Sequence, residues 1–223
     1  MTTSSDPARR AAVEDLGAAV RSLVRAVVDT ETDDATLAAA AVLARRAADL
    51  LGAAVRPPQR LAALDTPGVG YRVHSPVIGP GNPVSPPARI VRADPEAGCV
   101  EVECTLHRVH EGPPTYGHGG MSAMLMDQVL GTTAALGGQV GLTRSLETRY
   151  RRPVPLGEPL RLTGRITARD GQEIVTAGEI TTVARPDVVL VQATATFVVP
   201  RPDQLARLFG HVEGAAGPVP SGD

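Results

Sequence analysis

The sequence predicts an α+β fold, and three observations carry this prediction. Residues 121–136 form an apolar stretch long enough for a helix and without the alternation of a strand. Two segments with strand patterns precede this stretch, and four follow it. The chain has 223 residues, 43% of them apolar, which suffices for one domain of ordinary size with appendages. This order favours an antiparallel sheet wrapped around one central helix.

The first 56 residues have the pattern of two helices. Apolar residues recur at helical spacing over 13–27, with arginines between them, so we expect an amphipathic helix there. The same spacing predicts a second helix over 35–55. Three capping residues precede it: Thr32, Asp33 and Asp34. We expect residues 1–56 to form a helical hairpin packed on the main domain; the alternative is a lid over a binding site.

The remaining chain divides into three parts. Residues 57–87 are rich in proline and glycine, which excludes a regular helix and predicts an extended connector. Residues 88–200 form the expected main domain, and residues 201–223 are expected to be a flexible tail. Alternating apolar and polar residues predict strands in the main domain, over 88–93, 99–109, 141–150, 160–168, 173–183 and 188–199.

The central helix carries one carboxylate, Asp127, and is so apolar that we expect it to be buried on nearly all sides. An ionised carboxylate in such surroundings is costly unless it is paired or hydrogen-bonded. Asp127 therefore has either a structural partner or a chemical task. Taken alone, the helix favours the structural partner.

The spacing around Asp127 changes that interpretation. Four features carry it: the His118-Gly119-Gly120 turn, Asp127 nine residues after the His, Thr143 on the next strand, and the stretch YRRPVPLG over 150–157. Together they resemble the PaaI-like branch of the hotdog-fold acyl-CoA thioesterases, over residues 82–200. The resemblance implies a hotdog fold, here with an N-terminal helical extension. It also implies hydrolysis of an acyl-CoA thioester to the free acid and CoA, with no cofactor.

The resemblance makes Asp127 the general base or nucleophile. Because Gly119 and Gly120 lack side chains, their N–H groups at the positive end of the helix can approach an oxyanion closely. Asp127 lies seven residues further along, about 10 Å away at the rise of an α-helix, too far to act on the same carbonyl. We therefore expect one site to join two subunits, in a homodimer or a homotetramer built as a dimer of dimers.

Two further positions have open roles. Thr143 either orients the water or the carboxylate, or is an ordinary strand threonine. His118 resembles a residue that fixes the turn and packs, rather than an acid or base. Some branches of the family carry Asn or Gln six residues before the His, where this chain has Gly112.

Arg149, Arg151 and Arg152 lie near the end of a predicted strand. Their planar guanidinium groups suit the phosphates of coenzyme A. A solvated strand end explains the same charges, with Glu147 and Glu158 as pairing partners.

Composition limits the other function classes. The formal net charge of −2 gives no indication of nucleic-acid binding. No apolar run approaches the ~20 residues of a membrane span, and residues 1–10 are polar, so we expect a cytoplasmic protein. Cys99 and Cys104 are five apart in a predicted strand and face opposite sides, so neither a disulfide nor, with His107 and His110, a metal site is expected.

Two rival functions remain open. The chain could be an acyl-CoA binding protein without turnover, or a hotdog hydratase or dehydratase, although it lacks the signatures associated with the latter. With two Phe, three Tyr and no Trp, it favours short, medium or branched aliphatic acyl groups over aryl groups.

Overall fold

The computed structural model describes residues 6–62, 64–65, 72–138 and 140–212. Two helices, α1 (Pro7–Asp29) and α2 (Asp34–Gly52), precede the sheet. The central helix α3 covers Gly119–Ala134 and continues into a short 3-10 turn, Ala135–Gly137. The strands are β1 (Arg89–Asp94), β2 (Cys99–Thr105), β3 (Leu142–Tyr150), β4 (Pro159–Asp170), β5 (Glu173–Thr182) and β6 (Val191–Val198).

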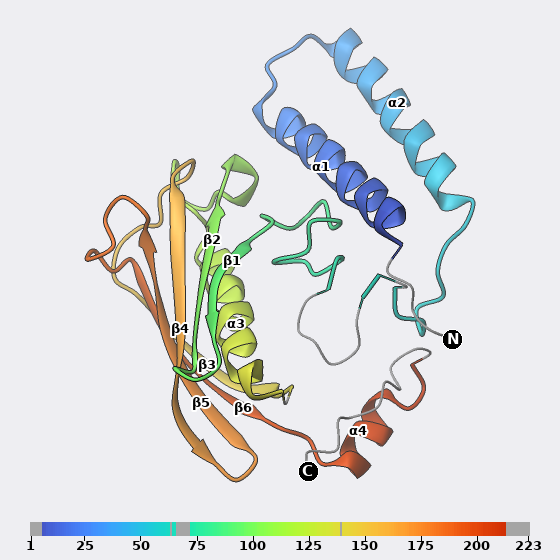
Figure 1. Cartoon of the computed structure of the whole chain (residues 1–223). Helices are drawn as coiled ribbons and strands as arrows, with labels where there is room; N and C mark the ends of the chain where they lie inside the picture. Colours follow the sequence, from blue (N-terminus) through green and yellow to red (C-terminus); the bar gives the residue numbers. More distant parts are fainter. Residues whose placement is uncertain (1–5, 63, 66–71, 139, 213–223) are drawn as a thin grey trace.

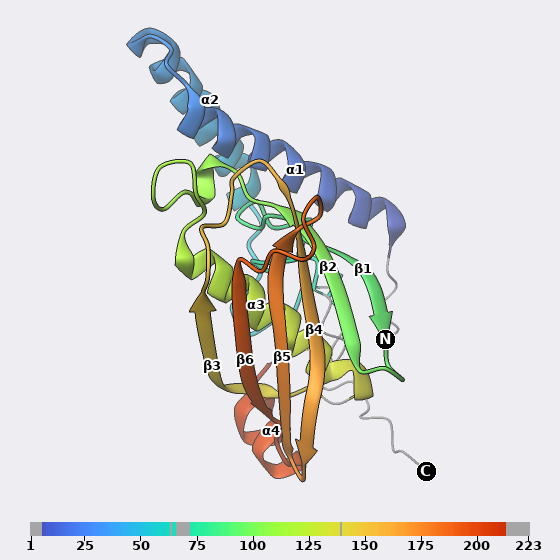
Figure 2. The same ribbon diagram turned by 90° about the vertical axis from the view of Figure 1, so that its left-hand side faces the viewer.

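The six strands form one sheet in the order β1-β2-β4-β5-β6-β3, and every neighbouring pair is antiparallel. Helix α3 lies across one face of the sheet, which curves around it (Figures 1 and 2). The predicted α+β arrangement is therefore confirmed. Strands β1 and β3 are the two edges of the sheet, and β3 follows α3 in the sequence.

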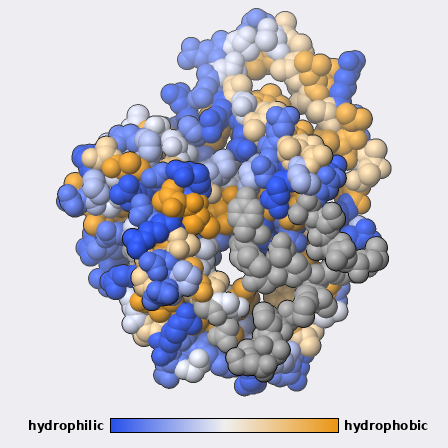
Figure 3. All heavy atoms as spheres, in the orientation of Figure 1, coloured by the Kyte–Doolittle hydropathy of each residue, from blue (hydrophilic) through white to orange (hydrophobic). Residues whose placement is uncertain are grey.

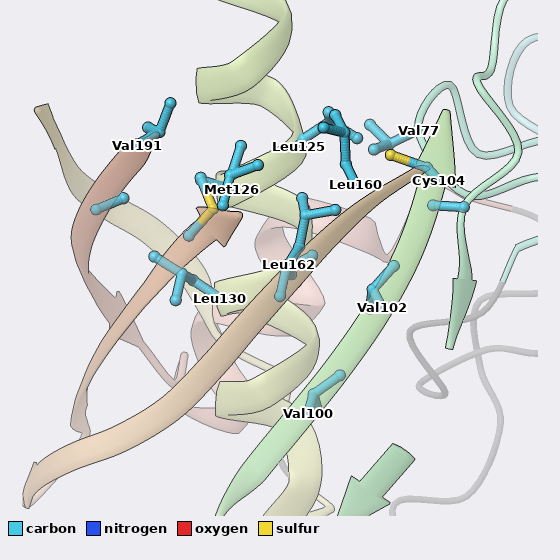
Figure 4. Close-up of a cluster of buried hydrophobic side chains, with 14 of the residues drawn as sticks. Val77, Val100, Val102, Cys104, Leu125, Met126, Leu130, Leu160, Leu162 and Val191 are labelled. Atoms are coloured by element: carbon cyan, nitrogen blue, oxygen red, sulfur yellow. The ribbon is translucent and has the colours of Figure 1, made fainter. Parts of the chain in front are cut away.

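The main core fills the space between α3 and the sheet. Strand β2 shows how the sequence builds it, because Val100, Val102 and Cys104 face inward while the residues between them are half-buried. Cys99 and Cys104 thus lie on opposite faces, as predicted. From the helix, Leu125 and Leu130 are fully buried in the same cluster (Figure 4).

Helix α3 is fully buried on one face and half-buried on the other, and none of residues 121–136 is exposed, which is close to the expected burial on nearly all sides. Seven of its residues are buried: Ser122, Leu125, Met126, Val129, Leu130, Thr133 and Ala134. Asp127 lies on the half-buried face. The sheet fully covers one side of the helix, and hydrophobic composition alone does not show where that cover ends.

Part of the expected connector belongs to the core. Val77 and Ile78 are buried in the main cluster, and Figure 4 shows Val77 near Leu160 and Cys104. Ser75 donates a hydrogen bond to the side chain of Gln128 on α3, at 3.3 Å. This segment lacks regular structure, yet it covers part of the helix that the sheet leaves open.

The N-terminal helices differ in how they pack. Gly17 is the one buried residue described in α1, and it lies against the backbone of Pro80 and Gly81. Arg21 donates to the carbonyl oxygens of Pro80 and Asn82, at 2.7 and 2.9 Å. Helix α1 therefore packs on the connector.

Helix α2 begins as predicted, with the Asp33 carboxylate accepting from the Thr36 N–H at 2.9 Å. None of its described residues is buried, and Leu43 and Leu50 are 65% and 79% exposed. Hydrophobic residues on this hairpin are visible at the upper right of Figure 3. The expected packing of the hairpin therefore applies to α1 and not to α2.

The region expected to be a flexible tail contains a fourth helix, α4 (Pro202–Phe209), which the sequence interpretation missed. Pro202 at its first turn and Asp203 after it are typical start signals. The rest of the expected tail, 213–223, lies outside the described residues. No helix in the described part of the chain is both long and apolar enough to cross a membrane.

Candidate active site

Asp127 and Thr143 meet on the helix side of the sheet. The Thr143 hydroxyl donates to Asp127 Oδ1 at 3.0 Å. In the sheet, Thr143 lies opposite Phe197, whose ring contacts α3 at Gly131. The register therefore directs Thr143 towards the helix, although 16 residues separate it from Asp127 in the sequence. A carboxylate held by one hydroxyl keeps further oxygen lone pairs free to accept a proton.

The His118-Gly119-Gly120 turn begins α3. His118 is the N-cap, and its Nδ1 accepts a hydrogen bond from the Gly120 N–H at 2.9 Å. Within the described structure, the Gly119 N–H has no acceptor. The sequence proposal of two amides for an oxyanion is therefore narrowed to Gly119, since the Gly120 amide is occupied by the cap.

Other residues hold this turn in place. The His118 N–H donates to the His110 carbonyl oxygen at 2.8 Å, and the Tyr150 hydroxyl donates to the Gly119 carbonyl oxygen at 3.0 Å. His110 is buried, and burial, followed by the charges of His107 and Arg25, lowers the pKa of its imidazole. A neutral His110 suits its role as acceptor of the His107 N–H.

Gly112 occupies the position at which some branches of the family carry Asn or Gln. A Cβ at this position would lie 2.8 Å from the Cα of His118. The loop thus passes so close to the turn that Asn or Gln would require it to shift. Gly112 therefore allows close packing here, at the position where a side chain could otherwise assist the reaction.

Arg149 and Arg151 lie on the face of the sheet away from Asp127, and Arg152 lies beyond the end of β3. Arg149 lies opposite Gln192 on the outer face of the sheet and pairs with Glu147 at 2.8 Å, one of the expected partners. Arg151 donates to the Gln192 side chain at 3.0 Å. Arg152 donates to the Val189 carbonyl oxygen at 2.8 Å.

The outer face has a hollow of about 700 Å³, which Arg149, Arg165 and Glu179 help to line. It lies across the sheet from α3, because residues on this face alternate with those that pack on the helix. The hollow and the pair of Asp127 and Thr143 are therefore separate features.

The Cys104 thiol is not suited to act as a second reactive centre. Burial raises the pKa of the Cys104 thiol to about 12, so it does not supply a thiolate nucleophile near neutral pH. In the part of the chain that the structure describes, no three His, Cys, Asp or Glu side chains are grouped for a metal ion.

Comparison with known proteins places this geometry in a family. The model of the thioesterase superfamily matches residues 116–189, which include the turn, Asp127 and Thr143. A crystal structure of a thioesterase superfamily protein is 37% identical, covering 83% of this chain and 94% of that one, with a TM-score of 0.71. The chain belongs to the thioesterase superfamily. Its sheet around α3 is the hotdog fold, as the resemblance implied.

Two further proteins are similar over part of the chain. The acyl-coenzyme A thioesterase THEM4 of Xenopus laevis is 33% identical over 90 residues. That match covers 40% of this chain and 39% of the relative, so the chain spans about two fifths of that curated protein. The E. coli PaaI protein is 18% identical over 51% of this chain and 83% of its own, with a TM-score of 0.47.

Proposed function

We propose that this member of the superfamily is an acyl-CoA thioesterase, which hydrolyses the thioester to the free acid and CoA. The observation that carries the proposal is the half-buried Asp127 carboxylate, held by Thr143 where α3 meets the edge strand β3. The name of the THEM4 relative supports CoA as the carrier.

In the proposed reaction, Asp127 removes a proton from water, and the resulting hydroxide attacks the thioester carbonyl carbon. The Gly119 N–H stabilises the oxyanion. The C–S bond then breaks, and the departing thiolate takes up the proton. Direct attack by the carboxylate, followed by hydrolysis of the anhydride, uses the same residues. Thr143 orients the carboxylate in either route, and His118 fixes the turn.

The site requires two subunits. Gly119 and Asp127 are eight residues apart on one helix, about 12 Å along its axis, so one carbonyl cannot contact both. Among the described strands only β6 pairs with β3, which leaves the other edge of β3 open to a second copy.

The register of such a pairing supports a shared site. If β3 pairs antiparallel with its own copy about Leu146, the middle of Leu142–Tyr150, then Tyr150 of the partner subunit lies opposite Leu142. Leu142 adjoins Thr143, and Tyr150 is bonded to Gly119. The pairing therefore brings the partner's glycine turn towards Asp127. This chain is thus proposed to act as a homodimer, or as a dimer of dimers.

The substrate is proposed to be a short, medium or branched aliphatic acyl-CoA. Contact of Arg149, Arg151 or Arg152 with the CoA phosphates remains part of the proposal. Arg152 is tested by replacement with Ala, which should raise the KM for an acyl-CoA more than for the corresponding acyl-pantetheine.

The decisive experiment is hydrolysis of a panel of acyl-CoAs followed with a thiol reagent. Asp127→Asn should lower kcat by about 10² or more, the usual scale for loss of a general base. Asp187→Asn, the same change at an exposed turn residue, should leave kcat within twofold. Full activity of Asp127→Asn would refute the proposed role of this carboxylate.

The same panel distinguishes the rival functions. Thiol release by the native protein supports a thioesterase. Tight binding of acyl-CoA without thiol release would identify a non-catalytic binding protein. Hydration of an enoyl-CoA would identify a hydratase.

A further inference from the structure

The peptide group that joins Gly119 to Gly120 is held at both ends. Its N–H, that of Gly120, donates to Nδ1 of His118 at 2.9 Å. Its carbonyl oxygen, that of Gly119, accepts from the Tyr150 hydroxyl at 3.0 Å. Rotation of this peptide plane would break both hydrogen bonds. The group is thus fixed from the cap on one side and from strand β3 on the other.

This constraint acts where the backbone is otherwise least constrained. Two consecutive glycines have more accessible φ and ψ values than any other pair of residues. The preceding peptide group, which carries the Gly119 N–H, is fixed through its carbonyl oxygen, since His118 O accepts from the Met121 N–H at 2.9 Å. Fixing both neighbouring planes sets the direction in which the Gly119 N–H points.

Tyr150 is poorly explained by stability alone. It is 56% exposed, and a hydrogen bond that water can replace contributes little to folding. It is nevertheless the last residue of β3, and its ring and hydroxyl lie 3.4 to 3.6 Å from the position of a Cβ on Gly119. The contact joins the free edge of the sheet to the start of α3, across 31 residues of sequence.

We propose that Tyr150 is a positioning residue, which holds the Gly119 N–H in the direction needed for an oxyanion. This inference rests on the proposed thioesterase function. It also connects assembly with activity: pairing of a second copy along β3 would cover Tyr150, exclude water from its hydroxyl and strengthen the hydrogen bond to Gly119. The His118-Gly119-Gly120 turn is then most rigid in the dimer, in which the Gly119 N–H binds the oxyanion.

The test compares Tyr150→Phe with Tyr116→Phe. Both changes remove one hydroxyl, but the Tyr116 hydroxyl forms no hydrogen bond in the described structure. Tyr150→Phe should lower kcat for acyl-CoA hydrolysis about tenfold and raise KM by a smaller factor, because the amide binds the carbonyl oxygen of the substrate but matters most in the transition state. Tyr116→Phe should leave both values within twofold of the native protein.

Binding of two acyl-CoA analogues separates positioning from a general structural effect. One analogue is a ketone, in which CH₂ replaces the sulfur and the carbonyl remains; the other is a thioether without a carbonyl. Tyr150→Phe should weaken binding of the ketone several-fold and leave the thioether unchanged. Equal weakening of both would indicate a structural role and overturn the inference.

Amide hydrogen exchange at Gly120 provides a readout that does not depend on turnover. Exchange should be faster in Tyr150→Phe than in Tyr116→Phe. If native protein hydrolyses no acyl-CoA, the proposed function fails, while the Gly120 exchange rate still decides whether Tyr150 fixes the turn. Unchanged exchange together with unchanged kcat in Tyr150→Phe would overturn the inference.

Discussion

At the scale of single residues, the environment of Asp127 decides its chemistry. The carboxylate lies on the half-buried side of α3, where the Thr143 hydroxyl is its one hydrogen-bond partner in the described structure. A hydroxyl donor orients a carboxylate without neutralising its charge. An arginine there would favour the structural ion pair that the helix alone suggested, and no such ion pair is present among the described residues.

Thr143 gives a prediction at this scale. Thr143→Val keeps the shape of the side chain and removes the donor, so the carboxylate loses one fixed oxygen. Because hydrogen bonds to charged groups are worth about 1.5 to 3 kcal/mol, kcat should fall about tenfold or more. Thr143→Ser retains the hydroxyl and should keep most of the activity. Equal kcat values for the Val and Ser variants would contradict the role of this hydroxyl.

The spacing in the sequence was sufficient to identify Asp127, Thr143 and the glycine turn as candidate site residues. It was not sufficient to predict the contacts that these residues form. Spacing shows that residues are arranged as in a family, whereas a hydrogen bond depends on the strand register. Tyr150 was quoted within a motif without any role, because its partner lies 31 residues away. The buried His110 was considered only as a metal ligand, although its carbonyl oxygen supports the turn.

At the scale of elements, α1 depends on one close backbone contact. A Cβ on Gly17 would lie 2.5 Å from the Pro80 carbonyl oxygen, and this neighbour is backbone that cannot rotate away. The connector that carries Pro80 continues from Val77 and Ile78 in the core. Helix α1 is thus linked to α3 through a segment without regular secondary structure.

Gly17→Ala is therefore expected to destabilise the protein. Alanine favours a helix by about 1 kcal/mol, but overpacking typically costs about 1 to 3 kcal/mol, so the contact should dominate. Urea denaturation should show a lower midpoint, and proteolysis should cleave α1 faster. Gly52→Ala in α2 is the control, because its Cβ would meet nothing within 4 Å. A Gly17→Ala variant as stable as Gly52→Ala would show that α1 is not held by this contact.

At the scale of the whole molecule, the proposed site is complete only when two chains meet. Gly119→Pro removes the amide hydrogen at the first position of α3, where proline is tolerated, and His118 before it already has the extended conformation that proline requires. Asp127→Asn removes the base. Each variant alone should be nearly inactive.

Mixing the two variants distinguishes a shared site from a site within one chain. In a shared site, a mixed dimer has one intact site, so random exchange of subunits should restore about a quarter of native activity. Hydrolysis after co-refolding, with light scattering to measure the assembly, checks this. If each site lies within one chain, the mixture should show no recovery of activity. An active monomer would exclude the shared site.

The sequence by itself determined the number, type and order of most elements, because the repeats of 3.6 and 2 residues are properties of neighbouring positions. It also determined the start of α2, where the predicted Asp33 caps the helix. Helix α4 is the exception, since it lies in a region interpreted as a tail.

Only the tertiary structure decided which face of α3 is covered and which side chains meet. Three hydrogen bonds join residues that are distant in the sequence. They link Thr143 to Asp127, 16 residues apart, Tyr150 to Gly119, 31 apart, and Ser75 to Gln128, 53 apart. These contacts follow from strand register, from the β-bulge between Thr143 and Ser145, and from the packing of the connector. A shift of one residue in register would turn Thr143 to the other face, and local patterns do not specify the register between distant strands.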